Sequence, residues 1–271
     1  FCTIPMARGK SRSDLIANVV RNAEELAAGG VKEIVLTGVN LGDFGKGPDG
    51  SGAIMPLSGR EENFFELIKE LDKVDGISRY RISSIEPNLL TNEIIEFVAN
   101  SDKFMPHFHI PLQSGSNKTL AAMRRRYKRE LYAERVGLIK KLMPHCAIGV
   151  DVIVGFPGET EDDFRETYDF LHALDVSYLH VFTYSERDNT QALEIQPVVP
   201  MSVRNERNKS LRNLSYMKMQ YFTEQQHGQT RQVLFEHQDK NGMMEGYTDN
   251  YIRINTPWRE EWVNNIVAWK I

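Results

Sequence analysis

The first residues of the chain could hold a metal–sulfur centre. A cysteine stands at position 2, directly before a loop that contains Pro5 and Gly9 and leads into a predicted helix. Iron–sulfur clusters are held by several thiolates from one short loop, and this loop supplies one of them. Because a soluble domain rarely starts at a loop with no strand before it, we expect Cys2 to follow a strand and further ligands upstream.

Small or hydrogen-bonding residues follow each predicted strand. In parallel α/β folds the carboxyl ends of the strands line the binding site. Each residue alone is more often structural: Gly38 and Gly115 would allow tight turns, and Thr160, followed by Asp163, suits a helix N-cap. Together, at one edge of a sheet, they predict a site where glycines admit a cofactor and polar side chains bind it. The candidates are Thr37, Gly38, Asn40, Ser83, Ser84, Gln113, Val154, Gly155 and Pro157.

Two histidines lie in the same region. His107 and His109 face one side of their strand, because side chains alternate along a strand. They are a possible metal pair, but no third ligand has a suitable spacing, so zinc is disfavoured. No Walker-type phosphate loop is present, and no Ser–His–Asp arrangement can be argued from the sequence.

A basic segment covers residues 118–141. It contains nine Lys or Arg residues and two Glu residues, a local net charge of +7 in a chain whose net charge is −4. A solvated helix face is the simple interpretation. The run Arg124, Arg125 and Arg126, with Tyr127 beside it, instead combines phosphate anchors with a stacking ring, as RNA binding requires.

Strand-like and helix-like segments alternate through residue 183. This order, with nearly continuous apolar strands, predicts an α/β fold with a parallel sheet. Five strands are visible, and a sixth before Phe1 would make a partial (β/α)6 TIM-like barrel. Residues 42–60 form a Gly-, Pro- and Ser-rich loop, which is either a lid or merely mobile. The predicted helices are 13–28, capped by Ser13, and 64–74, 93–99, 118–123, 129–142 and 161–174; the strands are 32–37, 77–84, 107–112, 147–154 and 177–183.

The pattern changes after residue 183. Pro197 and Pro200 mark a linker, and residues 203–226 read as one long polar helix. From Arg231 onward, short alternating strands with turn residues between them predict a small β-barrel of a kind that holds RNA. A β-extension that only packs on the core is the alternative. The predicted division is a catalytic domain at 1–200, a linking helix at 201–228 and the β-barrel at 229–271.

Composition limits the class of protein. An apolar share of 41% and a charged share of 26% are ordinary for a soluble globular chain. No apolar run is long enough to cross a bilayer and no signal-peptide pattern opens the chain, so we expect a cytoplasmic protein without a membrane partner. Two cysteines are too few for a disulfide framework.

These segments resemble the radical-SAM methylthiotransferase family over essentially the whole chain. Family members carry a C-x-x-x-C-x-x-C motif, of which Cys2 would be the third cysteine; the other two and the preceding strand are absent from this sequence. The resemblance also implies that the terminal strands form a TRAM-like RNA-binding barrel. The matching segments are 2–12 (CTIPMARGKSR), 33–40 (EIVLTGVN), 81–87 (RISSIEP), 109–116 (HIPLQSGS), 123–127 (MRRRY) and 151–160 (DVIVGFPGET).

The resemblance implies radical chemistry. A [4Fe–4S] cluster on three cysteines would bind S-adenosylmethionine at its open iron, and an electron donor would reduce it. The resulting deoxyadenosyl radical would take a hydrogen from the substrate, and a second cluster in the intact enzyme would deliver the methylthio group. The protein supplies placement and exclusion of water.

Strand-end position and family motif together suggest roles for the candidates. Cys2 would bind the cluster. The other assignments are Thr37, Gly38 and Asn40 near the methionine moiety, Ser83, Ser84 and Gln113 near the ribose or carboxylate, Val154, Gly155 and Pro157 near the adenine, and Arg124, Arg125, Arg126 and Tyr127 facing tRNA or the cofactor edge.

Residues 37–45 and 123–127 resemble the branch that modifies tRNA, at C2 of N6-threonylcarbamoyladenosine-37 beside the anticodon. A ribosomal-protein aspartate methylthiotransferase and a non-catalytic RNA-binding module are the alternatives. Asn189 departs from the family pattern, which has Gly there, and could alter a substrate loop. The family's N-terminal domain is missing, so we expect the chain as given to be inactive.

Overall fold

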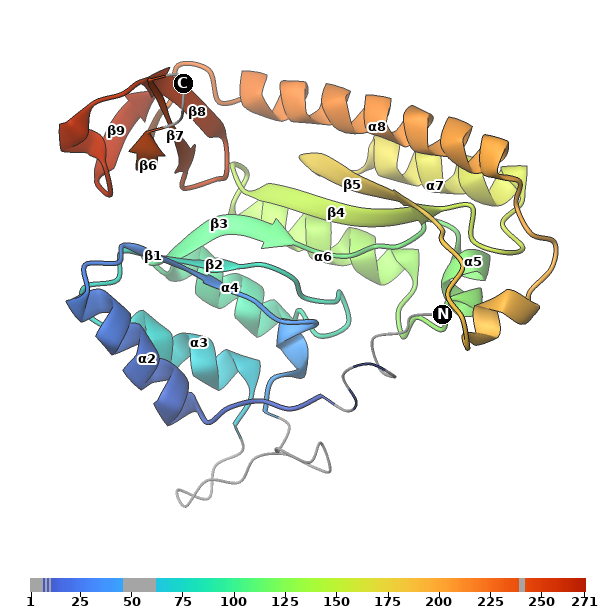
Figure 1. Cartoon of the computed structure of the whole chain (residues 1–271), viewed down its shortest axis with the longest axis horizontal. Coiled ribbons are helices and arrows are strands. Elements are labelled where there is room, and N and C mark those ends of the chain that lie inside the picture. Colours follow the sequence, from blue (N-terminus) through green and yellow to red (C-terminus); the bar gives the residue numbers. More distant parts are fainter. Residues whose placement is uncertain (1–6, 8, 10, 46–61, 239–241) are drawn as a thin grey trace.

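The structure is a computed structural model and describes residues 7, 9, 11–45, 62–238 and 242–271. Cys2 and most of the predicted loop at 42–60 lie outside these residues. The larger part is a parallel sheet of five strands in the order β1-β2-β3-β4-β5, as the alternating pattern predicts (Figure 1). The strands are β1 (Glu33–Leu36), β2 (Arg79–Ile82), β3 (Phe104–His109), β4 (Ala147–Val154) and β5 (Tyr178–Thr183).

Helices connect successive strands. The sequence predicts each of them to within a few residues, and both α6 and β4 match their predicted bounds. The predicted cap Ser13 is wrong, because α2 begins after Leu15 and the Ser13 hydroxyl instead accepts the Gly45 N–H. The predicted cap Thr160 is confirmed, with a reciprocal pair of hydrogen bonds to Asp163. The helices are α2 (Ile16–Ala28), α3 (Phe64–Asp72), α4 (Asn92–Asn100), α5 (Asn117–Ala122), α6 (Arg129–Leu142) and α7 (Glu161–Ala173).

Strand β3 begins and ends three residues before its predicted position. Pro106 lies inside it, where the missing N–H argues against a strand in the sequence alone. Backbone pairing nevertheless continues beyond the strand, because the Ile110 N–H donates to the Gly149 carbonyl at 2.9 Å. Residues 110–112 therefore still run beside β4, as predicted.

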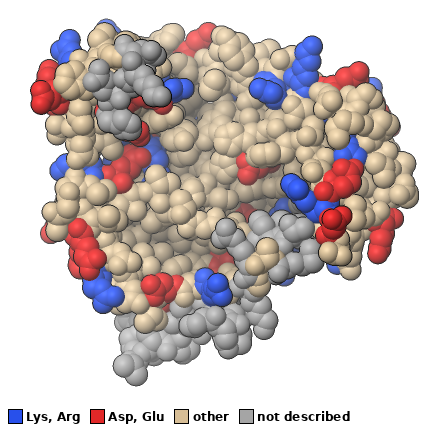
Figure 2. All heavy atoms as spheres, in the orientation of Figure 1, with Lys and Arg blue, Asp and Glu red and all other residues tan. Residues whose placement is uncertain are grey.

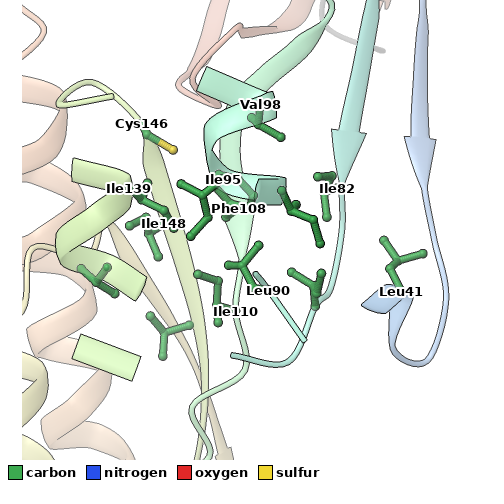
Figure 3. Packing of buried hydrophobic residues seen from close by; sticks show 14 of the residues in the cluster. Leu41, Ile82, Leu90, Ile95, Val98, Phe108, Ile110, Ile139, Cys146 and Ile148 are labelled. Carbon is green, nitrogen blue, oxygen red and sulfur yellow. The ribbon is translucent and has the colours of Figure 1, made fainter. Parts of the chain in front are cut away.

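One face of the sheet forms the main core. Strand residues such as Ile82, Phe108 and Ile148 are at most 2% exposed and pack against apolar side chains from the helices, including Ile95 of α4 and Ile139 of α6 (Figure 3). Every second residue of β4 belongs to this core, which fits a strand buried beneath helices. The opposite face of the sheet, which we call the open face, receives the alternate side chains.

Helix α8 (Met201–Glu224) covers the exposed edge of the sheet. It lies along β5, and Leu211 and Leu214 enter the main core. Its Ser215 hydroxyl accepts the Leu179 N–H at 2.8 Å, and its Asn208 amide donates to the Val181 carbonyl at 3.2 Å. These side chains satisfy backbone groups that an edge strand would otherwise leave unpaired. Among the described residues, no helix is both long and apolar enough to cross a membrane.

The remaining residues form a separate antiparallel sheet, the C-terminal sheet, with strands in the order β8-β7-β6-β9. All four strands contribute to one small core around Val233, Phe235 and Met244, which also includes Trp262. The structure therefore confirms a small all-β unit and describes it as a four-stranded sheet around its own core. Its strands are β6 (Thr230–Gln238), β7 (Met243–Thr248), β8 (Arg253–Pro257) and β9 (Ile266–Lys270).

The C-terminal sheet docks on the amino ends of the parallel strands. Arg79 and Arg81 of β2 are each 2% exposed and donate to its backbone carbonyls, while Arg81 also pairs with Glu33 at 2.7 Å. Nearby, Ala147, Phe222 and Ile252 form a joint apolar cluster. The carbonyl acceptors are Gln232 (2.7 Å) and Tyr247 (3.2 Å) for Arg79, and Thr248 (2.7 Å) and Asp249 (2.9 Å) for Arg81.

A glycine of β4, on the open face, tests how the ring of Tyr178 packs against the parallel sheet. A Cβ added at Gly149 would lie 2.4 Å from the ring of Tyr178, so we expect Gly149→Ala to destabilise the protein by about 1–3 kcal/mol in urea unfolding. Gly137 of α6 has open space around its Cα, so Gly137→Ala is the matched control and should stabilise by up to about 1 kcal/mol. Equal effects from the two substitutions would contradict the packing described.

Candidate functional site

A hollow of about 660 Å³ lies at the carboxyl edge of the sheet, the edge where the parallel strands end. Its described walls come from two segments: Ala7, Gly9 and residues 11–14 before α2, and residues 37–41 with Asp43 and Phe44 after β1. Three of the predicted site residues, Thr37, Gly38 and Asn40, line it together. The volume and the mixture of hydroxyl, amide and backbone groups fit a small polar cofactor.

The loops after β1 and β2 are joined by hydrogen bonds. The Asn40 side-chain oxygen accepts the Glu86 N–H at 3.2 Å, and the Leu41 N–H donates to the Ser84 carbonyl at 3.1 Å. Ser83 and Ser84 are half-buried beside them. The strand-end argument therefore brings these residues together, and it overlooked Glu86, which links the loop to the basic segment.

Gln113 is held in an unusual backbone conformation. Its φ is +72° and its side chain is 8% exposed, and its N–H donates to the Asp151 carbonyl at 2.8 Å. The next residues are fixed on α7, because the Gly115 N–H donates to the Thr167 hydroxyl and the Ser116 hydroxyl donates to Asp163. A left-handed conformation in a non-glycine residue persists only where the surroundings enforce it, which indicates a constrained position.

The candidates after β4 are buried. Val154 is fully buried in the main core, so its side chain points away from the open face. Gly155 has a φ of +74°, and a Cβ there would lie 2.3 Å from Cγ of Arg204. The prediction that this glycine leaves room for a cofactor is therefore corrected: Arg204 fills that room. Pro157 is also buried.

A buried carboxylate, which the strand-end reasoning did not select, fixes this loop. Glu159 is 5% exposed, and its Oε2 accepts the Gly155 N–H at 2.6 Å and a guanidinium N–H of Arg207 at 2.7 Å. Burial raises the pKa of Glu159, although both donors oppose the rise. The motif residues 155–159 thus form a structural corner that Glu159 holds and Arg204 packs against.

The basic segment is largely neutralised within the protein. Five of its nine cations are in ion pairs, among them Arg125 with Glu86 at 2.7 Å. Arg124 and Arg126 are exposed, and Arg124, with a φ of +56°, lines a second hollow of about 400 Å³ together with residues 191–195. The exposed cations of the predicted RNA contact therefore lie next to the loops at the carboxyl edge.

Tyr127 does not have the position expected of a stacking ring. It is 5% exposed, and its hydroxyl donates to the carbonyls of Pro111 and Leu112 at 3.0 and 3.1 Å. Burial raises the pKa of Tyr127 well above its usual value. The ring has no free face for a base, so the predicted stacking role is corrected to one of supporting the loop before Gln113.

The two histidines of β3 have different partners. His107 is buried beside the hydroxyl of Tyr178, at 2.8 Å from its Nε2, and burial holds its pKa well below the usual range. His109 instead lies 2.9 Å from Asp151, which also lies beside His180 of β5. Sequence spacing indicates no third ligand for the His107–His109 pair, and the neighbours that His109 has, Asp151 and His180, come from adjacent strands and show no spacing in the sequence.

Family comparison agrees with this architecture. The model described as the radical SAM superfamily matches residues 1–171. The chain belongs to this superfamily. Superfamily membership implies S-adenosylmethionine and an iron–sulfur cluster, and the hollow beside Thr37 has the size and donors to take the former. The predicted cluster ligand, Cys2, lies outside the described residues.

Curated relatives are bacterial tRNA-modifying enzymes. The chain is 41% identical to the threonylcarbamoyladenosine tRNA methylthiotransferase MtaB of Bacillus subtilis, over 100% of this chain and 59% of the relative. Identity to the MtaB of Aquifex aeolicus is 40%, over 94% and 58%. The tRNA-2-methylthio-N(6)-dimethylallyladenosine synthase of Lachnoclostridium phytofermentans is 33% identical, over 100% and 58%. The chain thus spans less than two thirds of the length of these relatives.

Among solved structures, coproporphyrinogen III oxidase (HemN) from Escherichia coli, a radical SAM enzyme, gives a TM-score of 0.49 at 13% identity, over 78% of this chain and 46% of that chain.

The anchor of the Gln113 loop should be sensitive to acid. Burial would raise the pKa of Asp163, but hydrogen bonds from Lys118, Thr160 and Ser116 outweigh it and lower the pKa to about 2. A lowered pKa in the folded state contributes stability above about pH 4 that is lost as the pH falls towards 2. We expect Asp163→Asn to have a lower free energy of unfolding than the wild type at pH 7. This difference in free energy should shrink by on the order of 2 kcal/mol as the pH falls from about 4 to about 2.

Urea unfolding at a series of pH values measures this gap. Asp162→Asn removes an exposed carboxylate from the same helical turn, and should change the unfolding free energy by less than about 1 kcal/mol at every pH. A gap for Asp163→Asn that does not change with pH would contradict the assignment.

The corrected role of Tyr127 also predicts a measurable effect. Tyr127→Phe leaves two buried carbonyls without their donor, so the unfolding free energy should fall by about 1–2 kcal/mol. Tyr221→Phe, at a tyrosine of α8 that is 61% exposed, is the control and should change it by less than about 0.5 kcal/mol. An unchanged stability in Tyr127→Phe would show that the hydroxyl does not support the loop.

Proposed function

We propose that the chain is the radical-SAM part of a tRNA methylthiotransferase whose substrate is N6-threonylcarbamoyladenosine at position 37 and whose product carries a methylthio group at C2. The observation that carries this proposal is the difference in identity over the full chain, 41% to an MtaB against 33% and 35% to dimethylallyladenosine synthases. The proposed cofactors are S-adenosylmethionine and two [4Fe–4S] clusters, with an electron donor and tRNA as partners.

The hollow at the carboxyl edge supports the proposed cofactor site. When bound, S-adenosylmethionine and the cluster supply the radical that removes the hydrogen from C2. We assign Thr37, Gly38 and Asn40 to the methionine end, because they line the hollow beside the segment that follows Cys2. Ser83, Ser84 and Gln113 lie along the same edge, as an extended ligand would require.

The proposed adenine contact uses backbone groups. Val154, Gly155 and Pro157 are buried, and Gly155 is packed against Arg204. Adenine presents ring nitrogens and an amino group that backbone N–H and C=O groups can bind. We therefore assign residues 154–157 to the adenine through those peptide groups of the segment that are not already bonded, which excludes the Gly155 N–H and the Val154 carbonyl.

The exposed arginines support an RNA partner. Arg124 lines the second hollow beside residues 191–195, Arg126 is its exposed near neighbour in sequence, and Arg125 is tied to the loop of Asn40 through Glu86. Cations at this position would bind phosphates of an RNA whose modified base enters from the open face. Figure 2 shows one side of the molecule, hollowed in its middle, with most charged side chains around the margin. We propose the C-terminal sheet as a second, TRAM-like RNA contact.

Mass spectrometry of tRNA nucleosides tests the proposal. The full protein that contains this chain should be expressed in a bacterium whose tRNA carries N6-threonylcarbamoyladenosine without a methylthio group. We expect a new nucleoside, heavier by one CH2S unit, because a C–H hydrogen is replaced by SCH3. Cys2→Ala should abolish it.

The second cysteine provides the matched control. Cys146 is fully buried and lies just before β4, at the end of the sheet opposite the hollow, so Cys146→Ala should retain the product. Modification of dimethylallyladenosine, or of a ribosomal-protein aspartate with unchanged tRNA, would contradict the proposed substrate. Binding of tRNA without any new modification would instead indicate a non-catalytic RNA-binding module.

A further inference from the structure

Three side chains from neighbouring strands converge on the open face, away from the hollow described above. His109 Nε2 and His180 Nδ1 lie 2.9 and 3.4 Å from the same oxygen, Asp151 Oδ1. One ligand atom from each residue lies within 4.8 Å of the others. The strand register produces this cluster, because Asp151 is paired with His180 and His109 with Gly149, one alternation away.

The cluster has the composition of a transition-metal site. Zinc binds imidazole nitrogen and carboxylate oxygen at about 2.0–2.2 Å, which places tetrahedral ligands about 3.3 Å apart. The two separations from Asp151 Oδ1, 2.9 and 3.4 Å, lie on either side of this value. Two neutral imidazoles and one carboxylate are also the ligand set of three-coordinate sites that hold non-haem iron and leave coordination positions open.

A hydrogen-bonded network is the alternative explanation. The His109–Asp151 separation of 2.9 Å suits a direct hydrogen bond, and the His180–Asp151 separation of 3.4 Å a longer one. Both imidazoles are thus turned towards the same carboxylate oxygen. A cation bound between the three groups would satisfy both imidazoles and the carboxylate at once.

The surroundings close one side of the cluster. The ring of Tyr178 passes over Gly149, where a side chain would collide with it, and lies 5.3 Å from the ring of His180. The Tyr178 hydroxyl is bonded to His107, whose ring stacks on Tyr251 of the C-terminal part at 4.1 Å. His107 therefore does not belong to the cluster. Aromatic rings, among them Tyr178, pack against this side of the cluster.

The other side of the cluster is open. The side chain of His180 is 53% exposed, whereas those of His109 and Asp151 are 13% and 25% exposed. A cation held here would keep positions free for water or for an oxygen of a molecule that enters from the open face. The guanidinium of Arg81, on the same face, is paired with Glu33 at 2.7 Å, a carboxylate that Arg79 shares.

We propose that His109, Asp151 and His180 form a binding site for a divalent first-row transition cation of the Zn²⁺ or Fe²⁺ kind, with coordination positions open to the open face. None of these three residues is among those assigned to the proposed cofactor site, and the inference does not depend on the proposed substrate.

Cobalt(II) is the probe, because its visible d–d bands report coordination without any turnover. Tag-free protein, stripped with a chelator, is titrated with CoCl2 in a Cys2→Ala background so that no thiolate competes; Cys146 is fully buried. We expect one Co²⁺ per chain. Asp151→Asn and His180→Asn should each weaken binding by at least about tenfold. His227→Asn, at an exposed histidine after α8, is the matched control and should leave the affinity unchanged.

A variant that gains a spectroscopic band distinguishes loss of the binding site from misfolding. His180 is half exposed, so His180→Cys should fold and place a thiolate at the site, and Co²⁺ should then give a sulfur-to-cobalt charge-transfer band. His227→Cys should give none. Equal Co²⁺ affinity in the wild type and His180→Asn, or no such band in folded His180→Cys, would overturn the proposal and leave a hydrogen-bonded network.

Discussion

Two buried guanidinium groups determine which parts of the parallel sheet stay accessible. Arg79 and Arg81 are almost fully buried, and a buried cation is tolerated only when its donors are satisfied. Glu33 supplies a carboxylate, and strand-end carbonyls of the C-terminal sheet supply most of the other acceptors. Because these carbonyls meet the arginines only at the amino ends of the strands, the C-terminal sheet is fixed there. The C-terminal part therefore lies away from the carboxyl edge, and it covers the open face at the two arginines and as far as His107, on which Tyr251 stacks.

Much of the fold could be predicted from sequence because its signals are local. Helical periodicity, the Thr160–Asp163 cap and the apolar run of β4 each lie within a few consecutive residues, and the structure confirms them. The errors occur where a local signal is misleading. Pro106 makes the start of β3 look unlike a strand in the sequence. Ser13 has the side chain of a helix cap, but its hydroxyl accepts the Gly45 N–H instead.

The predictions for the candidate site also succeeded where the signal is local and failed where it depends on contacts between distant segments. Strand-end position correctly brought Thr37, Gly38 and Asn40 to one hollow, because parallel strands end at one edge. The sequence could not show that Tyr127 is buried or that Arg204 fills the space at Gly155, since both depend on contacts between distant segments. Asp151 and His180 were missed for a related reason: only the register between strands makes them neighbours of His109.

The position of the C-terminal sheet also fixes its distance from the carboxyl edge. Strand β4 runs from the apolar joint at Ala147 to the carboxyl edge at Val154, and eight residues at about 3.3 Å each cover on the order of 25 Å. A polynucleotide that touched both the C-terminal sheet and Arg126 would have to bridge that span across the open face. The fixed position of the C-terminal sheet would then favour nucleic acids in which the bound backbone and the base at the carboxyl edge are separated by about this distance.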